Sequence, residues 1–441
     1  MTQNTAPGKG HPAAERSKRL GLLATIAIGI GGMVGGGIFS VLGLTVQVAG
    51  SAAYLAFVVS GLAALLTGYS YAKLSVRYPS RGGTVAFLNR AYKVPFFAGW
   101  LNVLLWLGYF VMLALYAFAF GSYLAELVGQ PTGGLWHHIF TSGVVVGFTL
   151  LNFLGSAIVG RAESALVYFK IAILLFFTIS GLFFLDPNRV TPSTFPGLIP
   201  IVFGGTLIYL AYEGFELIAN AAEDVDRPER TLPRAYYICI LFVIALYVLV
   251  AFVAVGNLSP AQIVQNRDYA LAAAAQPFLG TFGFTLIGIA AVVSTASALN
   301  ATLYGAAKFT YVIAQSGELP QQFARNIWNR PIAGLLATAA GTLLIANTLD
   351  IEGISLMGSA AFLIIFAFTN LANVRLAHET NSSRALSLLA AVVCTASLAA
   401  LTYYATTHVP AQLLVLAGMV ILAIAIEAGF LAARRTRHAG H

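Results

Sequence analysis

Four ionisable residues of this chain stand apart from its charged loops. Lys170 lies inside an apolar run, Glu213 and Glu216 lie inside a second run, and Glu427 lies near the end of a third. If these runs cross a membrane, a charged side chain within them is costly and by default marks a binding site or an ion pathway. These residues are therefore the first candidates for chemistry.

Glycine is unusually dense in the first apolar run. Six of the eleven residues at 29–39 are glycine, and each glycine costs a helix interior about 1 kcal/mol relative to alanine. Glycines spaced four apart would serve close helix packing. Gly35, Gly36 and Gly37 are consecutive and cover every face of a helix, so the pattern favours an unwound segment over a packing motif.

An unwound segment at membrane depth must line a cavity or be buried in protein. Its free N–H groups attract a carboxylate, and its free carbonyls suit an ammonium group or Na⁺. The run at 210–216 predicts a second, weaker break, because it places two glutamates and one glycine in an apolar span. Matching interruptions in two halves of a chain indicate the substrate site of an inverted-repeat transporter, although no repeat is visible as residue identity.

The elements that position these residues must be membrane helices. The chain has 441 residues, of which 59% are hydrophobic and 9% are charged, whereas a soluble domain carries about 25% charged residues. No Asp, Glu, Lys or Arg occurs in the 53 residues at 20–72, which is enough for two spans of about 20 residues each. This composition argues against a soluble enzyme, a nucleic-acid binder and a disordered chain, and the runs lack the ~10-residue alternation of a membrane β-barrel.

The apolar runs predict an all-α polytopic membrane protein with twelve transmembrane helices. With the N-terminus inside, 21 Lys and Arg residues lie on the inner side and two, Arg189 and Arg267, on the outer side. This bias predicts cytosolic termini in the cytoplasmic membrane, with flexible tails at 1–17 and 434–441. Cys239 and Cys394 fall in apolar runs and are expected to be packing residues. The predicted ranges are 19–46, 51–78, 96–128, 136–156, 160–185, 198–224, 233–256, 281–315, 331–349, 354–377, 384–406 and 410–433.

Several motifs resemble those of the amino acid/polyamine/organocation (APC) superfamily of permeases. Each motif alone is weak, but together they are specific, and the resemblance covers about residues 18–435. Gly36 stands where this superfamily often has serine, which removes one hydroxyl contact. The motifs are Gly31-Gly32-Met33-Val34-Gly35-Gly36-Gly37-Ile38-Phe39, Pro79-Ser80-Arg81-Gly82-Gly83, Tyr212-Glu213-Gly214-Phe215-Glu216 followed by Glu223-Asp224-Val225 and Pro228, and Gly317-Glu318-Leu319-Pro320.

The resemblance implies a LeuT-like fold of two inverted five-helix repeats, at 18–185 and 198–377, followed by two further helices at 383–433. It implies secondary transport of amino acids or related amines by alternating access, with no cofactor and no enzymatic activity. By position, the substrate carboxylate would meet amides of the first break, and its ammonium would meet carbonyls of both breaks. The implied substrate-binding residues are the amides of Gly35, Gly36 and Gly37, the carbonyls of Met33, Leu210 and Glu213, and in addition Tyr109, Tyr212 and Gly214.

Lys170 resembles a lysine in the fifth helix of Na⁺-independent members of this superfamily. Its ammonium would take the place of a Na⁺, against carbonyls of Gly31 and Gly32 and the hydroxyls of Ser294 or Ser297, which share a helix face. It would then couple proton movement to transport or act as a permanently charged strut. Snorkelling to an interface is disfavoured, because Lys170 lies about two and a half turns from Arg161.

The two glutamates leave alternatives open. Glu213 would either face the substrate or pack inside the protein against a hydroxyl. Glu216 would either sense protons or remain a protonated carboxyl that is hydrogen-bonded to its neighbours. The expected partners are a small amino acid or amine, a proton and the lipid bilayer, and the protein would be a monomer or a homodimer. An amine or polyamine permease and an amino acid exchanger are the alternatives, while an ion channel lacks a filter motif and ATP hydrolysis lacks a P-loop.

Overall fold

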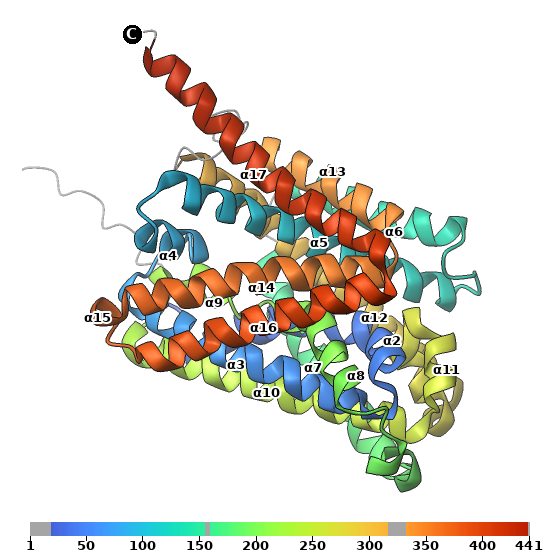
Figure 1. The fold of residues 1–441 in the computed structure, drawn as a ribbon. Coiled ribbons are helices and arrows are strands. Elements are labelled where there is room, and N and C mark those ends of the chain that lie inside the picture. Colours follow the sequence, from blue (N-terminus) through green and yellow to red (C-terminus); the bar gives the residue numbers. More distant parts are fainter. Residues whose placement is uncertain (1–18, 155–158, 316–331, 440–441) are drawn as a thin grey trace, which may run out of the picture.

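The computed structural model describes residues 19–154, 159–315 and 332–439, and within these ranges the regular structure is helical. The long helices lie side by side in a bundle, and α17 projects beyond the others at its C-terminal end (Figure 1). The β contact in this part of the chain is a single bridge between Leu20 and Val225. The predicted tail at 1–17 and the motif at 317–320 lie outside the described residues.

Helices occupy every range in which a span was predicted. The long helices are α1 (Leu22–Met33), α2 (Gly37–Ala49), α3 (Ala53–Arg77), α5 (Pro95–Leu127), α6 (Leu135–Leu154), α7 (Val159–Leu182), α8 (Leu198–Leu207), α10 (Pro228–Asn257), α12 (Ala270–Gln315), α13 (Ile332–Thr348), α14 (Ile351–Arg375), α16 (Arg384–His408) and α17 (Pro410–Ala439). The short elements that matter below are α4 (Thr84–Ala91), η5 (Tyr209–Tyr212), α9 (Leu217–Asn220), α11 (Pro260–Gln265), η7 (Arg267–Tyr269) and α15 (Ala377–Thr380).

By length and composition, eight helical stretches of the described residues can cross a membrane. The pair formed by Leu198–Leu207 and Tyr209–Asn220, bent by 55°, makes a ninth span if it is taken as one. α1 and α13 are apolar but shorter. The chain is therefore a multi-pass membrane protein, and the count of twelve spans and the repeat boundaries stay predictions.

Local capping residues explain where several helices begin. Pro228 occupies the first turn of α10, a position where its missing N–H costs nothing, so this helix starts five residues before the predicted 233. Asp350 caps α14 by accepting from the Gly353 amide, and Ser383 caps α16 in the same way. Gly280 is non-helical (φ 60°) inside α12, which is where the span predicted at 281–315 begins.

Two features differ from the predicted pattern. α4 lies in a loop for which no helix was predicted, since its eight residues are too few for a span. α17 continues to Ala439, so part of the segment predicted as a tail at 434–441 extends the last helix. Both cysteines are free and buried, as expected of packing residues.

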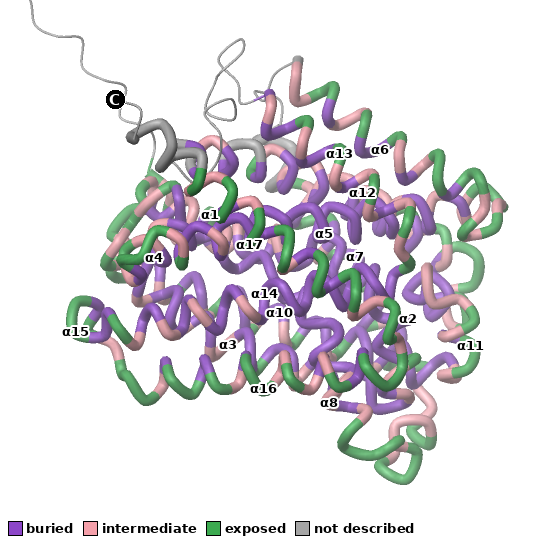
Figure 2. Tube along the Cα trace, turned by 45° about the horizontal axis from the view of Figure 1, so that its top comes forward, coloured by how far each residue is buried: buried purple, intermediate pink, exposed green. Residues whose placement is uncertain are grey.

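Burial separates central helices from peripheral ones. α5 and α14 are almost completely buried, whereas α16 and α17 expose much of their apolar surface, as the green segments along these two helices show in Figure 2. Exposed leucines and isoleucines on a helix of this length suit contact with lipid. The broken helices therefore lie in a core that also contains α5, α14 and the buried faces of α3 and α10.

Candidate functional site

Two interrupted helices lie against each other in the middle of the bundle. α1 ends at Met33 and α2 begins at Gly37, so three residues form the first break. The second break lies between α8 and α9, where Gly214 has φ +117°. A Cβ atom on Gly214 would lie 2.5 Å from the carbonyl carbon of Gly32, and one on Gly32 would lie 2.8 Å from the Gly214 oxygen. The main chains of the two breaks are therefore in direct contact at Gly32 and Gly214.

Hydroxyl groups satisfy carbonyls that the breaks leave without helical partners. Tyr247 on α10 donates to the Met33 carbonyl at 2.6 Å. Ser294 on α12 donates to the Val34 carbonyl at 3.1 Å and also to that of Gly35. At membrane depth no water replaces a lost main-chain bond, so such side chains are what makes an unwound segment tolerable.

Serines of α14 do the same for the second break. Ser355 and Ser359 each donate to the Leu207 carbonyl at 2.7 Å. Ser359 also accepts from the Leu210 amide at 3.0 Å. The backbone around Leu210 is therefore held by α14, with the Leu210 side chain filling the space beside Gly358.

Lys170 reaches the first break from α7. Its side chain is 2% exposed, and its Nζ donates to the Gly31 carbonyl at 3.1 Å. The side chain thus turns into the protein and does not snorkel. Ser294 donates to carbonyls about one helical turn after Gly31. Ser297, the other serine predicted to meet Lys170, is half-buried. A lysine from α7 and a serine from α12 thereby hold carbonyls about one turn apart in the same segment.

The glycines of the first break provide room for neighbouring groups. A Cβ on Gly36 would lie 2.4 Å from the Tyr116 ring, and one on Gly37 would lie 2.8 Å from the Ala211 carbonyl oxygen. A serine at Gly36, as in many members of the superfamily, would therefore require Tyr116 to move. Within the described residues no side chain caps the N-terminus of α2, and first-turn amides of a helix are suited to an anionic group.

Tyr109 and Tyr212, both predicted to meet the substrate, have hydrogen-bond partners within the protein. Tyr109 on α5 donates to Glu216 at 2.6 Å. Tyr212 donates to the Phe57 carbonyl of α3 at 2.8 Å. The structure therefore brings Tyr109 to Glu216, whereas the Tyr212 hydroxyl points towards α3.

Glu216 is surrounded by hydroxyl donors from three elements. Besides Tyr109, the hydroxyls of Thr84 on α4 and Tyr71 on α3 lie 3.3 Å and 3.4 Å from its Oε2. These two hydroxyls are hydrogen-bonded to each other at 2.8 Å, so one of them donates to Glu216 and the other to its neighbour. Glu213 is equally buried, at 1% exposure, but its Oε1 has no hydrogen-bond partner in the described part of the chain. The sequence carried no signal for Thr84 or Tyr71, because neither is unusual in its own segment.

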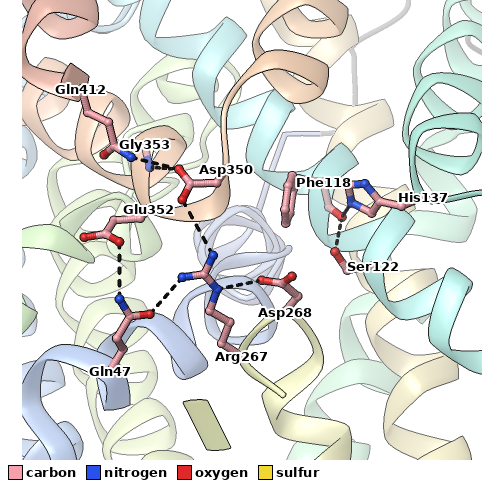
Figure 3. A network of polar contacts seen from close by, with 10 residues as sticks. All are labelled: Gln47, Phe118, Ser122, His137, Arg267, Asp268, Asp350, Glu352, Gly353 and Gln412. Atoms are coloured by element: carbon pink, nitrogen blue, oxygen red, sulfur yellow. Dashed lines mark hydrogen bonds and ion pairs between the residues drawn. The ribbon is translucent and has the colours of Figure 1, made fainter. Parts of the chain in front are cut away.

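A second polar cluster, which we call the α2 latch, joins α2 to η7 and α14 (Figure 3). Arg267 donates to the Gln47 side chain at 3.1 Å and forms ion pairs with Asp268 at 3.5 Å and Asp350 at 3.8 Å. Gln47 in turn donates to Glu352 at 3.4 Å. The latch ties the half-helix after the first break to two neighbouring elements. Sequence analysis identified Arg267 only as a loop cation.

No group of three or more His, Cys, Asp or Glu side chains within the described ranges is arranged to hold a metal ion. The site offers main-chain amides and carbonyls, one lysine, two glutamates and several hydroxyls. Such a set suits a small molecule that carries both a carboxylate and an ammonium group.

Comparisons with known proteins agree with this arrangement. A family model described as "Amino acid permease" matches residues 20–377. An uncharacterized protein of Methanocaldococcus jannaschii is 37% identical over 390 residues (88% of this chain, 90% of that protein), and the inner membrane transport protein YbaT of Escherichia coli is 32% identical over 380 residues (86% and 88%). The serine/threonine exchanger SteT of Bacillus subtilis is 26% identical over 309 residues (69% of each chain).

Solved structures show the same fold. A manganese transporter of Eremococcus coleocola superposes with a TM-score of 0.62 over 98% of this chain and 97% of that one, at 13% sequence identity. At this identity the likeness concerns the fold alone.

Replacing Gly214 by alanine is expected to destabilise the protein. A positive φ costs a residue with a side chain about 1–3 kcal/mol, and the new methyl group would overlap the backbone of Gly32. We expect a lower thermal midpoint in detergent, measured by fluorescence-detected gel filtration. Gly143→Ala on α6 is the matched control, since nothing lies within 4 Å of its Cβ position. An unchanged midpoint in Gly214→Ala would contradict the close backbone contact.

Breaking the α2 latch is expected to loosen α2. In Arg267→Gln, a cysteine introduced at the buried Val46 of α2 should react faster with a maleimide in the detergent-purified protein. Loss of one hydrogen bond of about 1 kcal/mol corresponds to roughly a fivefold increase in rate. Arg189→Gln is the control, because Arg189 forms its ion pair with Asp186 inside the same loop. Equal rates in the two variants would show that the latch does not restrain α2.

Proposed function

The chain belongs to the amino acid permease family and is a membrane transporter, and from this premise we propose that it moves amino acids across the cytoplasmic membrane by alternating access, coupled to protons and independent of Na⁺. The observation that carries this proposal is the contact between the two unwound backbones at Gly32 and Gly214, with the Lys170 ammonium on the adjoining Gly31 carbonyl.

Main-chain recognition of a zwitterion follows from the two breaks. The amides at Gly35, Gly36 and Gly37 begin α2, whose N-terminus is uncapped and therefore favours a carboxylate. The carbonyls of Met33, Leu210 and Glu213 lie on the facing backbones and suit an ammonium group. Because these contacts involve no side-chain atoms of the substrate, the remaining pocket residues would set which amino acid is accepted.

Lys170 supports Na⁺ independence. An ammonium group that donates to the Gly31 carbonyl supplies the positive charge that a bound Na⁺ would bring to this break. A lysine is also able to lose its proton when it is buried. We therefore propose that Lys170 couples proton movement to the rearrangement of α1, in a protein whose termini are cytosolic, as the distribution of Lys and Arg predicts.

An amine permease is the second candidate, and Glu213 is the observation that favours it. The Glu213 Oε1 atom is buried and has no hydrogen-bond partner in the part of the chain that the structure describes. Next to the proposed ammonium position, it would attract an amine that lacks a carboxylate. Exchange of one amino acid for another is the third candidate, because a relative is named as a serine/threonine exchanger.

The substrate class is tested by thermal shift of the purified protein against amino acids and their decarboxylated amines. A ligand present at 100 times its Kd stabilises the folded state by about 2.7 kcal/mol, so a substrate should raise the midpoint. We expect at least one amino acid to do so and the matching amine to have no effect. A response to amines alone would replace the amino acid proposal with the amine permease.

Two variants of Lys170 test the coupling. If the lysine must release its proton, both Lys170→Ala and Lys170→Arg should reduce uptake driven by a pH gradient about tenfold or more, while counterflow of substrate persists. Arginine keeps the charge but does not deprotonate in proteins. Lys73→Ala is the control, because Lys73 is a surface lysine that donates to the Asn381 carbonyl. Full pH-driven uptake by Lys170→Arg would identify the lysine as a charged strut.

A further inference from the structure

We propose that Glu213 and Glu216 form a carboxyl pair that holds one proton, that Glu213 carries this proton, and that the pair is a proton-binding site separate from Lys170. Both side chains are 1% exposed and lie in the second break, three residues apart. The role of this proton in transport rests on the function proposed above. The argument that the proton is present does not, because it uses only the burial and the hydrogen-bond partners of the two glutamates.

The first argument is the closeness of two buried carboxyl groups. Glu213 and Glu216 are three residues apart in the same unwound segment, and both are 1% exposed. An ionised carboxyl group only accepts hydrogen bonds, so neither could donate to the other if both were ionised. Two negative charges side by side in a buried site also repel each other, and one shared proton removes that repulsion.

The second argument assigns the proton to one member of the pair. Tyr109 donates to Oε1 of Glu216, and the hydrogen-bonded hydroxyls of Thr84 and Tyr71 together supply one donor to its Oε2. Hydroxyl donors on both oxygens stabilise the ionised form of a carboxyl group. None of these hydroxyls donates to Glu213, whose Oε1 has no partner within the described residues. Glu213 is thus the member that gains least from ionisation and donates its proton to Glu216.

Tyrosines from α3, α5, η5 and α10 face the pair, namely Tyr71, Tyr109, Tyr116, Tyr209 and Tyr236. Lys170 donates to the Gly31 carbonyl of α1, whereas Gly214, which lies between the two glutamates in the sequence, contacts the neighbouring Gly32. The lysine and the segment of the pair therefore meet adjacent residues of α1.

A singly protonated pair has a net charge of −1. This charge matches the single ammonium group that the Met33, Leu210 and Glu213 carbonyls are proposed to bind. When such a group arrives next to Glu213, the proton is able to leave for solvent while one positive charge stays beside the pair. Substrate and proton would then exchange at the second break.

The experiment is infrared spectroscopy of the full-length protein reconstituted in lipid at neutral pH, without substrate. The C=O stretch of a protonated carboxyl group is distinct from that of an ionised one. We expect the wild type to show such a band, and Glu213→Gln to lose it. Glu427→Gln is the matched control, because Glu427 on α17 is an equally buried carboxyl that lies against Gly99 of α5, and its replacement should leave the Glu213 band in place.

Two outcomes would overturn the proposal. A band that survives in Glu213→Gln but is lost in Glu216→Gln would place the proton on Glu216. Absence of any protonated carboxyl band in the wild type would exclude the shared proton without reference to a variant, even if a variant fails to fold. Because no substrate is present, these results do not depend on whether amino acids are the cargo, which the thermal-shift comparison decides separately.

Discussion

The structure depends on two stretches of unwound main chain touching inside an apolar bundle. In this setting every amide and carbonyl must find a partner in the protein, since hydrocarbon offers none. The contact between Gly32 and Gly214 is possible only because neither has a Cβ atom, and Gly214 adopts a φ that other residues rarely take. Glycine at these two positions is therefore a steric requirement, and the rest of the core is arranged around it.

The surrounding helices supply the hydrogen bonds that the breaks lose. Tyr247 on α10, Ser294 on α12 and Ser359 on α14 each bond to a main-chain group of a break. These helices lie on different sides of the breaks, so a displacement of either interrupted helix must exchange several of these bonds at once. Such coupled exchange is a physical route by which a small movement of α1 or α8 becomes a change between two packed states.

The sequence predicted the elements better than the contacts between them. The helices follow from apolar runs, and the first break follows from consecutive glycines, because both signals are local. The partners of Glu216 were not predictable, since Thr84 and Tyr71 come from segments more than a hundred residues away and are ordinary residues there. The α2 latch was missed for the same reason: Arg267 gains its meaning only when η7 packs on Gly43 of α2. The helix α4 was not predicted, because a helix of eight residues in a loop is too short to give a hydropathy signal.

The two breaks differ in the sign of the charged side chains beside them. Lys170 brings a positive charge to the carbonyls of the first break, and the glutamates bring negative charge to the second. If the two were in contact they would neutralise each other and form a passive ion pair. In this structure Lys170 donates to the Gly31 carbonyl, and Glu216 accepts from the Tyr109 hydroxyl, so each charge has its own hydrogen-bond partner. A ligand with one positive and one negative group placed between the breaks would thus interact with both, and a change of protonation at either end would alter how the two interrupted helices attract each other.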